Sequence, residues 1–445
     1  MTTQTDQRRT VRQETDTLVH RVQQLAHPLT TPADLDPLLE QIGDARYVLI
    51  GEASHGTSDY YTWRARLSQR LIQERGFSFI AVEGDWPDCY KVNRYAKGYP
   101  DAGDSAFDVL HAFARWPTWM WANWEVVAFV EWLRSHNQDA PAGRRVGFYG
   151  LDVYSLWESM ESIIAYLDDE DPAAAELARE AYRCFEPYGE DAQAYAHDTM
   201  LVPEICADEV VELLAAVRSK APSYDHDPEA SLNTEQNAWV MANAERYYRA
   251  MVRGGAESWN VRDRHMTSTL ARLMAHHDAD AKGIIWAHNT HVGDARATDM
   301  ANVGMVNIGQ LVREAHGDDG VVLVGFGSHH GSVIAGSAWD APMRRMPVPA
   351  AADGSWEDVM RQAGADDKLL LLPEVSPSGP FGRARGHRAI GVVYHPERER
   401  GNFVPTVLPR RYDAFLYIDE SHALHPLHIA PADGKEPPET YPWGF

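Results

Sequence analysis

The sequence predicts an α/β fold, with a mostly parallel sheet flanked by helices and a helical insertion between the two halves of the sheet. Three observations predict it. Short apolar runs end abruptly in polar or glycine-containing turns, which is typical of strands buried on both faces of a parallel sheet. Helical patterns follow most of these runs, and alternating strands and helices indicate an α/β architecture. A long stretch in the middle of the chain shows helical periodicity and no clear strand.

Five apolar runs are the expected strands of this sheet. They are Tyr47–Gly51, Phe79–Val82, Val146–Gly150, Gly283–Trp286 and Val321–Phe326. A helix is expected from Ser58 to Glu74, because Trp63, Leu67 and Leu71 recur at helical spacing and Gly76 marks its end.

The helical middle segment sets the expected domain boundaries. We expect residues 1–170 to form the N-terminal half of the α/β core, 171–255 the helical insertion and 256–445 the C-terminal half. The insertion contains strong helix formers and stops at a pair of glycines, Gly254 and Gly255. The segment from Arg344 to Trp356 is expected to be a surface loop, and the Pro-rich tail from Ala430 onward to be irregular.

The composition limits the partners and the location of the chain. Its 445 residues carry a formal net charge of -24, so we expect no binding to nucleic acid or to anionic membranes. Cys89, Cys184 and Cys206 are odd in number and widely spaced, which argues against a disulfide framework. No apolar run suits a signal peptide or a membrane span of about 18 residues. We therefore expect a cytoplasmic protein.

Ionisable side chains follow three of the expected strands. Glu52 and His55 come after the first strand, Glu83 after the second, and His288 and His291 after the fourth. Because ligands of a parallel sheet bind beyond the carboxyl ends of its strands, we expect these groups to converge on one site. Each motif by itself is also compatible with an ordinary polar turn, and an H-x-x-H pair arises by chance in a chain with 20 histidines.

Two further features are candidates for the same site. Arg64 lies on the expected helix after the first strand, where an arginine is usually solvated. Trp116, Trp119 and Trp121 form an aromatic cluster, which is more often part of a core but is a candidate surface for binding substrate.

Seven sequence blocks, found in order from about Tyr47 to Ile418, resemble the erythromycin esterase family. The blocks are GEASHGT, VEGDW, RWPTWMW, FYGLDVYSL, SWNVRDRHM, WAHNTHVGDARAT and GFGSHHGSV. The sixth block is similar to that of the broad bacterial branch of erythromycin esterase homologues. The resemblance implies a hydrolase that cleaves a carboxylic ester or a macrolide lactone with activated water, without a covalent intermediate. It also implies a core in two related halves, and no metal or other cofactor.

The resemblance carries over to individual positions. The family's G-E-x-x-H block matches residues 51–55, its arginine on the next helix and its acid after the second strand are present, and its H-x-x-H block matches residues 288–291. The implied catalytic residues are His55, Glu52, Glu83, His288, His291 and Arg64.

Ester hydrolysis needs a base for water and a donor for the developing oxyanion. Neutral histidine suits the first task, and a carboxylate on its second nitrogen strengthens it. His55 is the expected base, because it lies at a strand end where Gly56 is expected to leave room for a ligand. Arg64 and the pair His288 and His291 are candidate oxyanion donors.

Two other functions remain open from the residues alone. Two carboxylates and three imidazoles also suit a divalent metal, which predicts a metal-dependent hydrolase. A tryptophan-lined cleft is also compatible with a non-catalytic protein that binds a hydrophobic ligand, although burying five ionisable groups is costly for such a protein. The sequence contains no G-x-S-x-G, G-x-x-x-x-G-K-[ST] or H-E-x-x-H motif.

Overall fold

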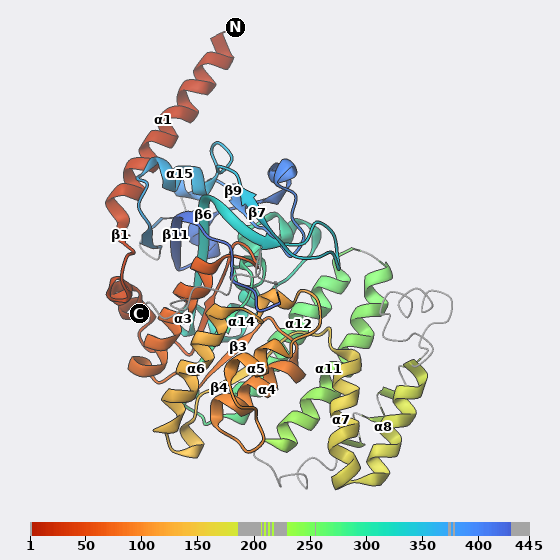
Figure 1. The fold of residues 1–445 in the computed structure, drawn as a ribbon. Helices are drawn as coiled ribbons and strands as arrows, with labels where there is room; N and C mark the ends of the chain where they lie inside the picture. The colour runs from red at the N-terminus through yellow and green to blue at the C-terminus, as the bar shows by residue number, and fades with distance from the viewer. Residues whose placement is uncertain are drawn as a thin grey trace, which may run out of the picture.

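A mixed β-sheet forms the centre of the molecule, and helices cover both of its faces (Figure 1). The computed structural model describes residues 2–185, 206, 209–210, 212–213, 216–217, 229–253, 255–372, 375–376 and 379–428. The strands in this part of the chain are β1 (Ala26–Pro28), β2 (Tyr47–Ile50), β3 (Phe79–Val82), β4 (Gly147–Gly150), β5 (Gly283–Trp286), β6 (Val321–Ala335), β7 (Arg344–Val348), β8 (Lys368–Leu371), β9 (Arg385–Arg388), β10 (Phe403–Thr406) and β11 (Ala414–Ser421).

The strand order places chain segments from both ends of the sequence side by side. Within the described residues the main sheet has nine strands in the order β1-β8-β11-β6-β2-β5-β3-β4, with β7 paired to β6. Strands β11, β6, β2, β5, β3 and β4 are parallel to one another, whereas β1, β7 and β8 pair antiparallel with their neighbours. A mostly parallel α/β sheet is therefore confirmed. Strand β5 lies between β2 and β3, so the strands of the two expected halves interleave.

Helices flank this sheet along most of the chain. Their bounds are α1 (Thr2–Leu25), α2 (Asp36–Ile42), α3 (Ser58–Arg75), α4 (Trp86–Lys97), α5 (Ala106–His111), α6 (Trp124–Gln138), α7 (Leu156–Glu170), α8 (Pro172–Phe185), α11 (Ala230–Arg253), α12 (Glu257–His276), α13 (Asn289–Val292), α14 (Ile308–His316), α15 (Trp356–Gln362) and α16 (Leu408–Arg411). Figure 1 shows that α1 extends away from the body, whereas α7, α8 and α11 lie together on another side. No described helix has the length and apolar content that crossing a bilayer requires.

The predicted strands are buried on both faces, which explains their continuous apolar runs. Successive residues of a strand point to opposite faces. In β2, Val48 and Ile50 pack into one hydrophobic cluster with α2, α3 and α6, whereas Tyr47 and Leu49 pack into a second cluster with α12, α14 and α15. Each residue of the strand therefore needs an apolar side chain, and no polar alternation remains in the sequence.

All five predicted strands are present, and the helix expected from Ser58 is α3. Strand β6 continues beyond its predicted end to Ala335. The expectation of a surface loop from Arg344 to Trp356 is wrong, because β7 occupies Arg344–Val348 and pairs with β6. Pairing with β6 makes this segment a strand, in which Met346 and Val348 are buried in a small hydrophobic cluster and the other residues are exposed. The expected irregular tail from Ala430 lies outside the described residues.

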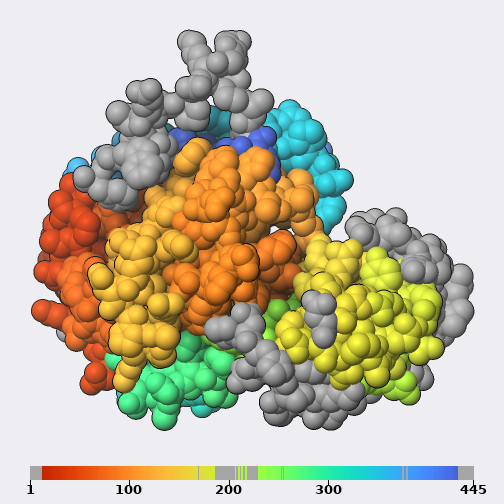
Figure 2. Space-filling model, turned by 60° about the horizontal axis from the view of Figure 1, so that its bottom comes forward, coloured from red at the N-terminus to blue at the C-terminus, as the bar shows by residue number. Residues whose placement is uncertain are grey.

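Helices α7, α8 and α11 have a hydrophobic cluster of their own. It includes Met160, Phe185 and Met241 and is separate from the clusters on the sheet. In Figure 2 the yellow surface of this region stands to one side of the red and orange body. The expectation of no disulfide needs correction, because Cys184 at the end of α8 is bonded to Cys206, with 5.8 Å between their Cα atoms. The domain boundaries given above stay a prediction.

Candidate functional site

The site begins where three adjacent parallel strands end in register. Ile50, Trp286 and Val82 are aligned as the last residues of β2, β5 and β3. The chain continues from these strands into the segments that carry Glu52, His288 and Glu83. The strand order therefore brings together side chains that lie more than 200 residues apart in the sequence. A hydrogen bond of 2.7 Å from the His288 backbone N–H to Glu83 Oε2 joins two of these segments directly.

Glu52 holds His55 in a fixed orientation. Its Oε1 lies 2.9 Å from His55 Nδ1, and because a carboxylate only accepts, the proton is on Nδ1 and Nε2 keeps a lone pair. Its Oε2 accepts a hydrogen bond of 2.6 Å from Arg64 Nη2. The Arg64 side chain is 0% exposed and stacks over Tyr61, so it is a buried partner of Glu52 and not a solvated arginine. In the described part of the chain, His55 Nε2 has no hydrogen-bond partner.

Glu83 lies in a second network, centred on Arg262 of α12. Arg262 donates to Glu83 Oε1 at 2.6 Å, to both carboxylate oxygens of Asp152 and to His291 Nε2 at 2.9 Å. An arginine only donates, so His291 Nε2 accepts and Nδ1 donates to Asp263 at 2.9 Å. Burial favours protonation of Glu83, but the Arg262 guanidinium and the hydrogen bond from the His288 backbone outweigh it and hold the pKa of Glu83 well below its usual range. Both nitrogens of His291 are therefore engaged.

His288 presents an unused donor beside His55. His288 Nδ1 lies 2.8 Å from the Thr290 hydroxyl and accepts from the Thr290 backbone N–H at 3.3 Å; with the hydroxyl donating as well, the proton of the neutral ring is on Nε2. His288 Nε2 is buried without a hydrogen-bond partner. The two ring centroids, of His55 and His288, lie 4.8 Å apart.

The electrostatic surroundings shift the pKa values of His55 and His288 in opposite directions. Burial lowers the pKa of His288 well below its usual value, and the neighbouring His55 lowers it further, so His288 is neutral near pH 7. Burial also acts to lower the pKa of His55, but Glu83 and the hydrogen-bonded Glu52 outweigh it and raise that pKa above 6.5. One ring is therefore the stronger base, and the other is a neutral N–H donor.

A cavity of about 150 Å³ opens onto His55 and Glu83. Its other polar lining residues are Asp85, Asp88, Arg115, Thr118, Asp152, Tyr154 and Arg262, and its apolar ones include Phe113, Met120 and Val392. Burial raises the pKa of Asp85 to about 7, although the ion pair with Arg115 opposes this effect. Glu52, Arg64, His288 and His291 lie behind this lining.

The predicted tryptophans have different positions relative to the cavity. Trp116 and Trp121 line it. Trp119 is fully buried, packs edge-on against Trp116 and is not among the lining residues. A further tryptophan, Trp339, lines the cavity from the segment between β6 and β7.

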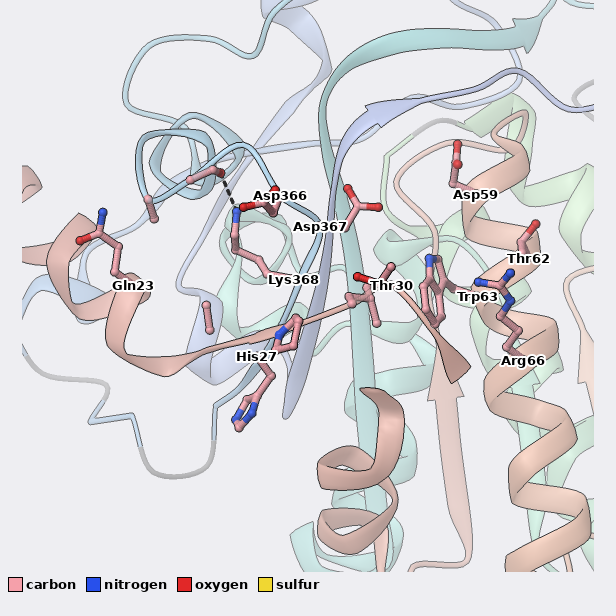
Figure 3. A pocket seen from close by; sticks show the side chains of 15 residues that line it. Gln23, His27, Thr30, Asp59, Thr62, Trp63, Arg66, Asp366, Asp367 and Lys368 are labelled. Atoms are coloured by element: carbon pink, nitrogen blue, oxygen red, sulfur yellow. Dashed lines mark hydrogen bonds between the residues drawn. The ribbon is translucent and has the colours of Figure 1, made fainter. Parts of the chain in front are cut away.

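A larger hollow of about 680 Å³ lies near the far edge of the sheet, between α1, α3 and the segment before β8 (Figure 3). Asp59, Asp366 and Asp367 line it, and the Arg66 guanidinium stacks 4.7 Å from the Trp63 ring on another side. None of the predicted site residues is part of its lining. The smaller cavity at His55 is therefore the better candidate for chemistry, despite its size.

Gly56 does not leave room for a ligand, which corrects the expectation from the sequence. A Cβ atom at this position would lie 1.9 Å from the backbone oxygen of Ile334 in β6. The backbone N–H of Ile334 in turn donates to the carbonyl of Gly56 at 3.0 Å. Close packing of two backbones therefore explains why glycine follows His55.

Among the residues that contact the predicted ones, Asp152, Arg262 and Asp263 were not predicted from the sequence. Asp152 has the same signal as Glu52, because it is an acid that lies two residues after the end of a buried strand, here β4. Arg262 and Asp263 lie on a helix, where neighbouring charged residues give no such signal. Among the described residues, no group of three or more His, Cys, Asp or Glu side chains is arranged to hold a metal ion.

Comparisons with known proteins find a matching family model and a similar curated protein. The family model for erythromycin esterase matches residues 72–421. An erythromycin esterase type II of Escherichia coli is 23% identical over 329 residues, which cover 70% of this chain and 75% of that relative. The match to the family model begins after Glu52, His55 and Arg64.

Three solved structures have a similar fold. A succinoglycan biosynthesis protein superposes with a TM-score of 0.75 at 21% identity, and a protein from Bacillus cereus with 0.76 at 19%; each comparison covers 92% of this chain and 98% of the other. A mutant of the erythromycin esterase EreC in its open conformation has a TM-score of 0.65 at 15% identity, over 89% of this chain and 97% of the other. At these identities the likeness concerns the fold.

Proposed function

The chain belongs to the erythromycin esterase family, and from this premise we propose that it hydrolyses a carboxylic ester or lactone with water activated by His55. Family membership supports a hydrolase that acts on esters. The observation that carries the residue assignment is the pairing of His55 with Glu52, which leaves Nε2 free at the cavity that His55 lines. The proposed substrate is a small molecule, and a macrolide lactone is one candidate.

In the proposed reaction, His55 Nε2 removes a proton from water as the water oxygen attacks the ester carbonyl carbon. The Glu52 carboxylate stabilises the imidazolium that forms, and Arg64 fixes the orientation of Glu52 from the other side. Collapse of the tetrahedral intermediate breaks the bond to the alcohol oxygen, which takes the proton from the imidazolium. An ester gives one carboxylic acid and one alcohol, a lactone gives a single ring-opened hydroxy acid, and no covalent enzyme intermediate is needed.

We assign electrostatic stabilisation of the oxyanion to the N–H dipole of His288, which lies behind the cavity lining beside His55. Its Nε2–H is buried and has no partner, so it loses no existing hydrogen bond when negative charge develops nearby. Its lowered pKa keeps the ring neutral, which preserves the basicity of His55 4.8 Å away. Glu83, Arg262 and His291 form the support that holds the His288 backbone in place.

The test is hydrolysis of an ester and lactone panel, including macrolides, followed by mass spectrometry. We expect His55→Asn to lower turnover by at least about 100-fold, the lower end of general acid–base contributions, because asparagine has a similar size but cannot accept the proton. Circular dichroism checks that the variant folds, which we expect since His55 is at the rim of the sheet. A folded His55→Asn protein that keeps most of its activity would place the base elsewhere.

The metal-dependent alternative makes a different prediction. Glu52 and Glu83 already have guanidinium partners at 2.6 Å, so their oxygens are poorly placed to bind a divalent ion as well. We therefore expect incubation with a chelator, followed by its removal, to leave the rate of hydrolysis unchanged. A stoichiometric divalent ion in elemental analysis, together with activity that is lost on chelation and restored by that ion, would establish the metallohydrolase instead.

A further inference from the structure

Trp339 is exposed to solvent and at the same time lines the cavity that contains His55. It is 60% exposed, and in the described part of the chain only Val303, at 63%, is as exposed among the large apolar side chains. A single exposed apolar side chain is ordinary on a protein surface. The position of Trp339 at the mouth of the candidate site is what distinguishes it from Val303, which does not line the cavity.

The segment that carries Trp339 is held firmly although its indole is exposed. On one side, Trp116 Nε1 donates to the carbonyl of Ala341 at 3.0 Å. On the other, the backbone of Gly336 pairs with residues 392–394, through hydrogen bonds of 2.9 and 3.0 Å. The indoles of Trp339 and Trp116 lie 4.7 Å apart, tilted by 55°. The Trp339 ring therefore stands on a preorganised support, which lowers the entropy cost of binding a ligand.

The size of the cavity shows why this position matters. Sites that enclose a whole small-molecule ligand usually measure about 300–1,000 Å³, and the cavity at His55 measures about 150 Å³. The enclosed volume holds an ester group and a few further atoms. The remainder of a larger substrate must extend through the mouth, where Trp116 and Trp339 are the aromatic surfaces available to it.

The lining has different chemistry around the buried His55, which we call the floor, and around the exposed Trp339, which we call the mouth. The floor around His55 carries charged groups, among them Glu83 and Arg262. The exposed part of the lining contains the indoles of Trp116 and Trp339 together with Arg115, whose side chain is 33% exposed. The two indoles bind flat apolar groups by burying their surface and by stacking. A substrate that matches both parts has a polar ester at one end and a bulky apolar body at the other.

We propose that Trp339, supported by Trp116, determines specificity for esters with a bulky apolar body, which it binds at the mouth while the ester group lies beside His55. The inference rests on the proposed function and adds the substrate class to it. A small ester reaches the floor without touching Trp339, so its hydrolysis is independent of this residue.

The test compares two methyl esters, methyl acetate and methyl 2-naphthoate, so that the leaving group is methanol in both and only the naphthoate carries an aromatic body; hydrolysis is followed by acid release in a pH-stat. Each is assayed with the wild type, Trp339→Ala, Trp339→Phe and Val303→Ala. For the naphthoate we expect Trp339→Ala to raise KM roughly threefold to tenfold with little change in kcat, as the loss of an aromatic pair predicts. Phenylalanine should restore most of this loss. The acetate should show no change with any variant, and Val303→Ala should change neither ester.

Binding of methyl 2-naphthyl ketone, which cannot be hydrolysed, gives a readout that does not depend on catalysis. Calorimetry should show weaker binding to Trp339→Ala than to the wild type and to Val303→Ala. If the wild type hydrolyses neither ester but ketone binding depends on Trp339, the proposed function fails and the binding surface stands. Equal binding of the ketone to wild type and Trp339→Ala, or no binding to the wild type, overturns the inference, as does an equal effect of Trp339→Ala on both esters.

Discussion

The two glutamates that follow β2 and β3 have similar places in the sequence and different partners in the fold. Glu52 bonds to one histidine and one arginine, whereas Glu83 bonds to Arg262 and to the backbone of His288. In the proposed mechanism Glu52 acts on His55 directly, and Glu83 acts as a positioning residue and as a fixed negative charge. Both raise the pKa of His55, against the effect of burial.

This balance predicts the pH dependence of hydrolysis. The imidazolium of His55 cannot accept a proton, so kcat/KM should rise with pH as His55 loses its proton. Because the pKa of His55 is raised from 6.5, the midpoint of the acid limb should lie above 6.5. The measurement is a pH profile of kcat/KM with a saturable ester.

A matched variant identifies the group that titrates. Glu52→Gln removes a carboxylate that raises the pKa of His55, so its residual activity should have a midpoint at lower pH than the wild type. A variant that lost activity through misfolding alone would not move the midpoint. A wild-type midpoint below 6.5, or one that Glu52→Gln leaves unchanged, contradicts the assignment of His55.

At the scale of elements, the loop after β2 is packed against the long strand β6. Gly56 makes this contact possible, since a methyl group there would overlap the backbone of Ile334. Backbone atoms cannot move aside as a flexible side chain can, so β6 or the loop that carries His55 would have to shift.

We therefore expect Gly56→Ala to lower the free energy of unfolding by about 1–3 kcal/mol, the usual cost of overpacking, and to reduce activity. Urea denaturation measures the first effect and ester hydrolysis the second. Gly143→Ala is the matched control, because a Cβ at Gly143 meets no atom within 4 Å. The control should unfold at the same urea concentration as the wild type or a slightly higher one. Equal stability of both variants would contradict the packing described here.

At the scale of the whole molecule, the dominant property is the formal net charge of -24. Like charges repel most strongly when little salt screens them. We expect the protein to show no binding to duplex DNA or to phosphatidylserine vesicles even at low ionic strength, where attraction would be easiest to detect. Fluorescence anisotropy measures binding to DNA, and sedimentation measures binding to the vesicles. If the protein binds DNA or vesicles and the binding weakens as salt is added, its surface carries a basic region that the net charge does not reveal.

The sequence by itself determined the buried strands and the groups that follow them. A strand buried on both faces needs an apolar residue at every position, so β2, β3 and β5 are visible as uninterrupted runs. The residues after each run are then at the carboxyl end of the sheet, which is why Glu52, His55, Glu83 and His288 could be assigned to one edge from local patterns.

The tertiary structure alone decided which partners these groups have. Arg262 lies 179 residues from Glu83, and its place on a helix surface has no signal in local periodicity. Gly56 was interpreted as space for a ligand, but the space is filled by the backbone of Ile334, which lies more than 270 residues later in the chain. The same holds for β7 and for Trp339, whose positions depend on pairing with β6 and on the packing of Trp116. Local sequence patterns encode burial along one element, whereas contacts between elements depend on how the whole chain packs.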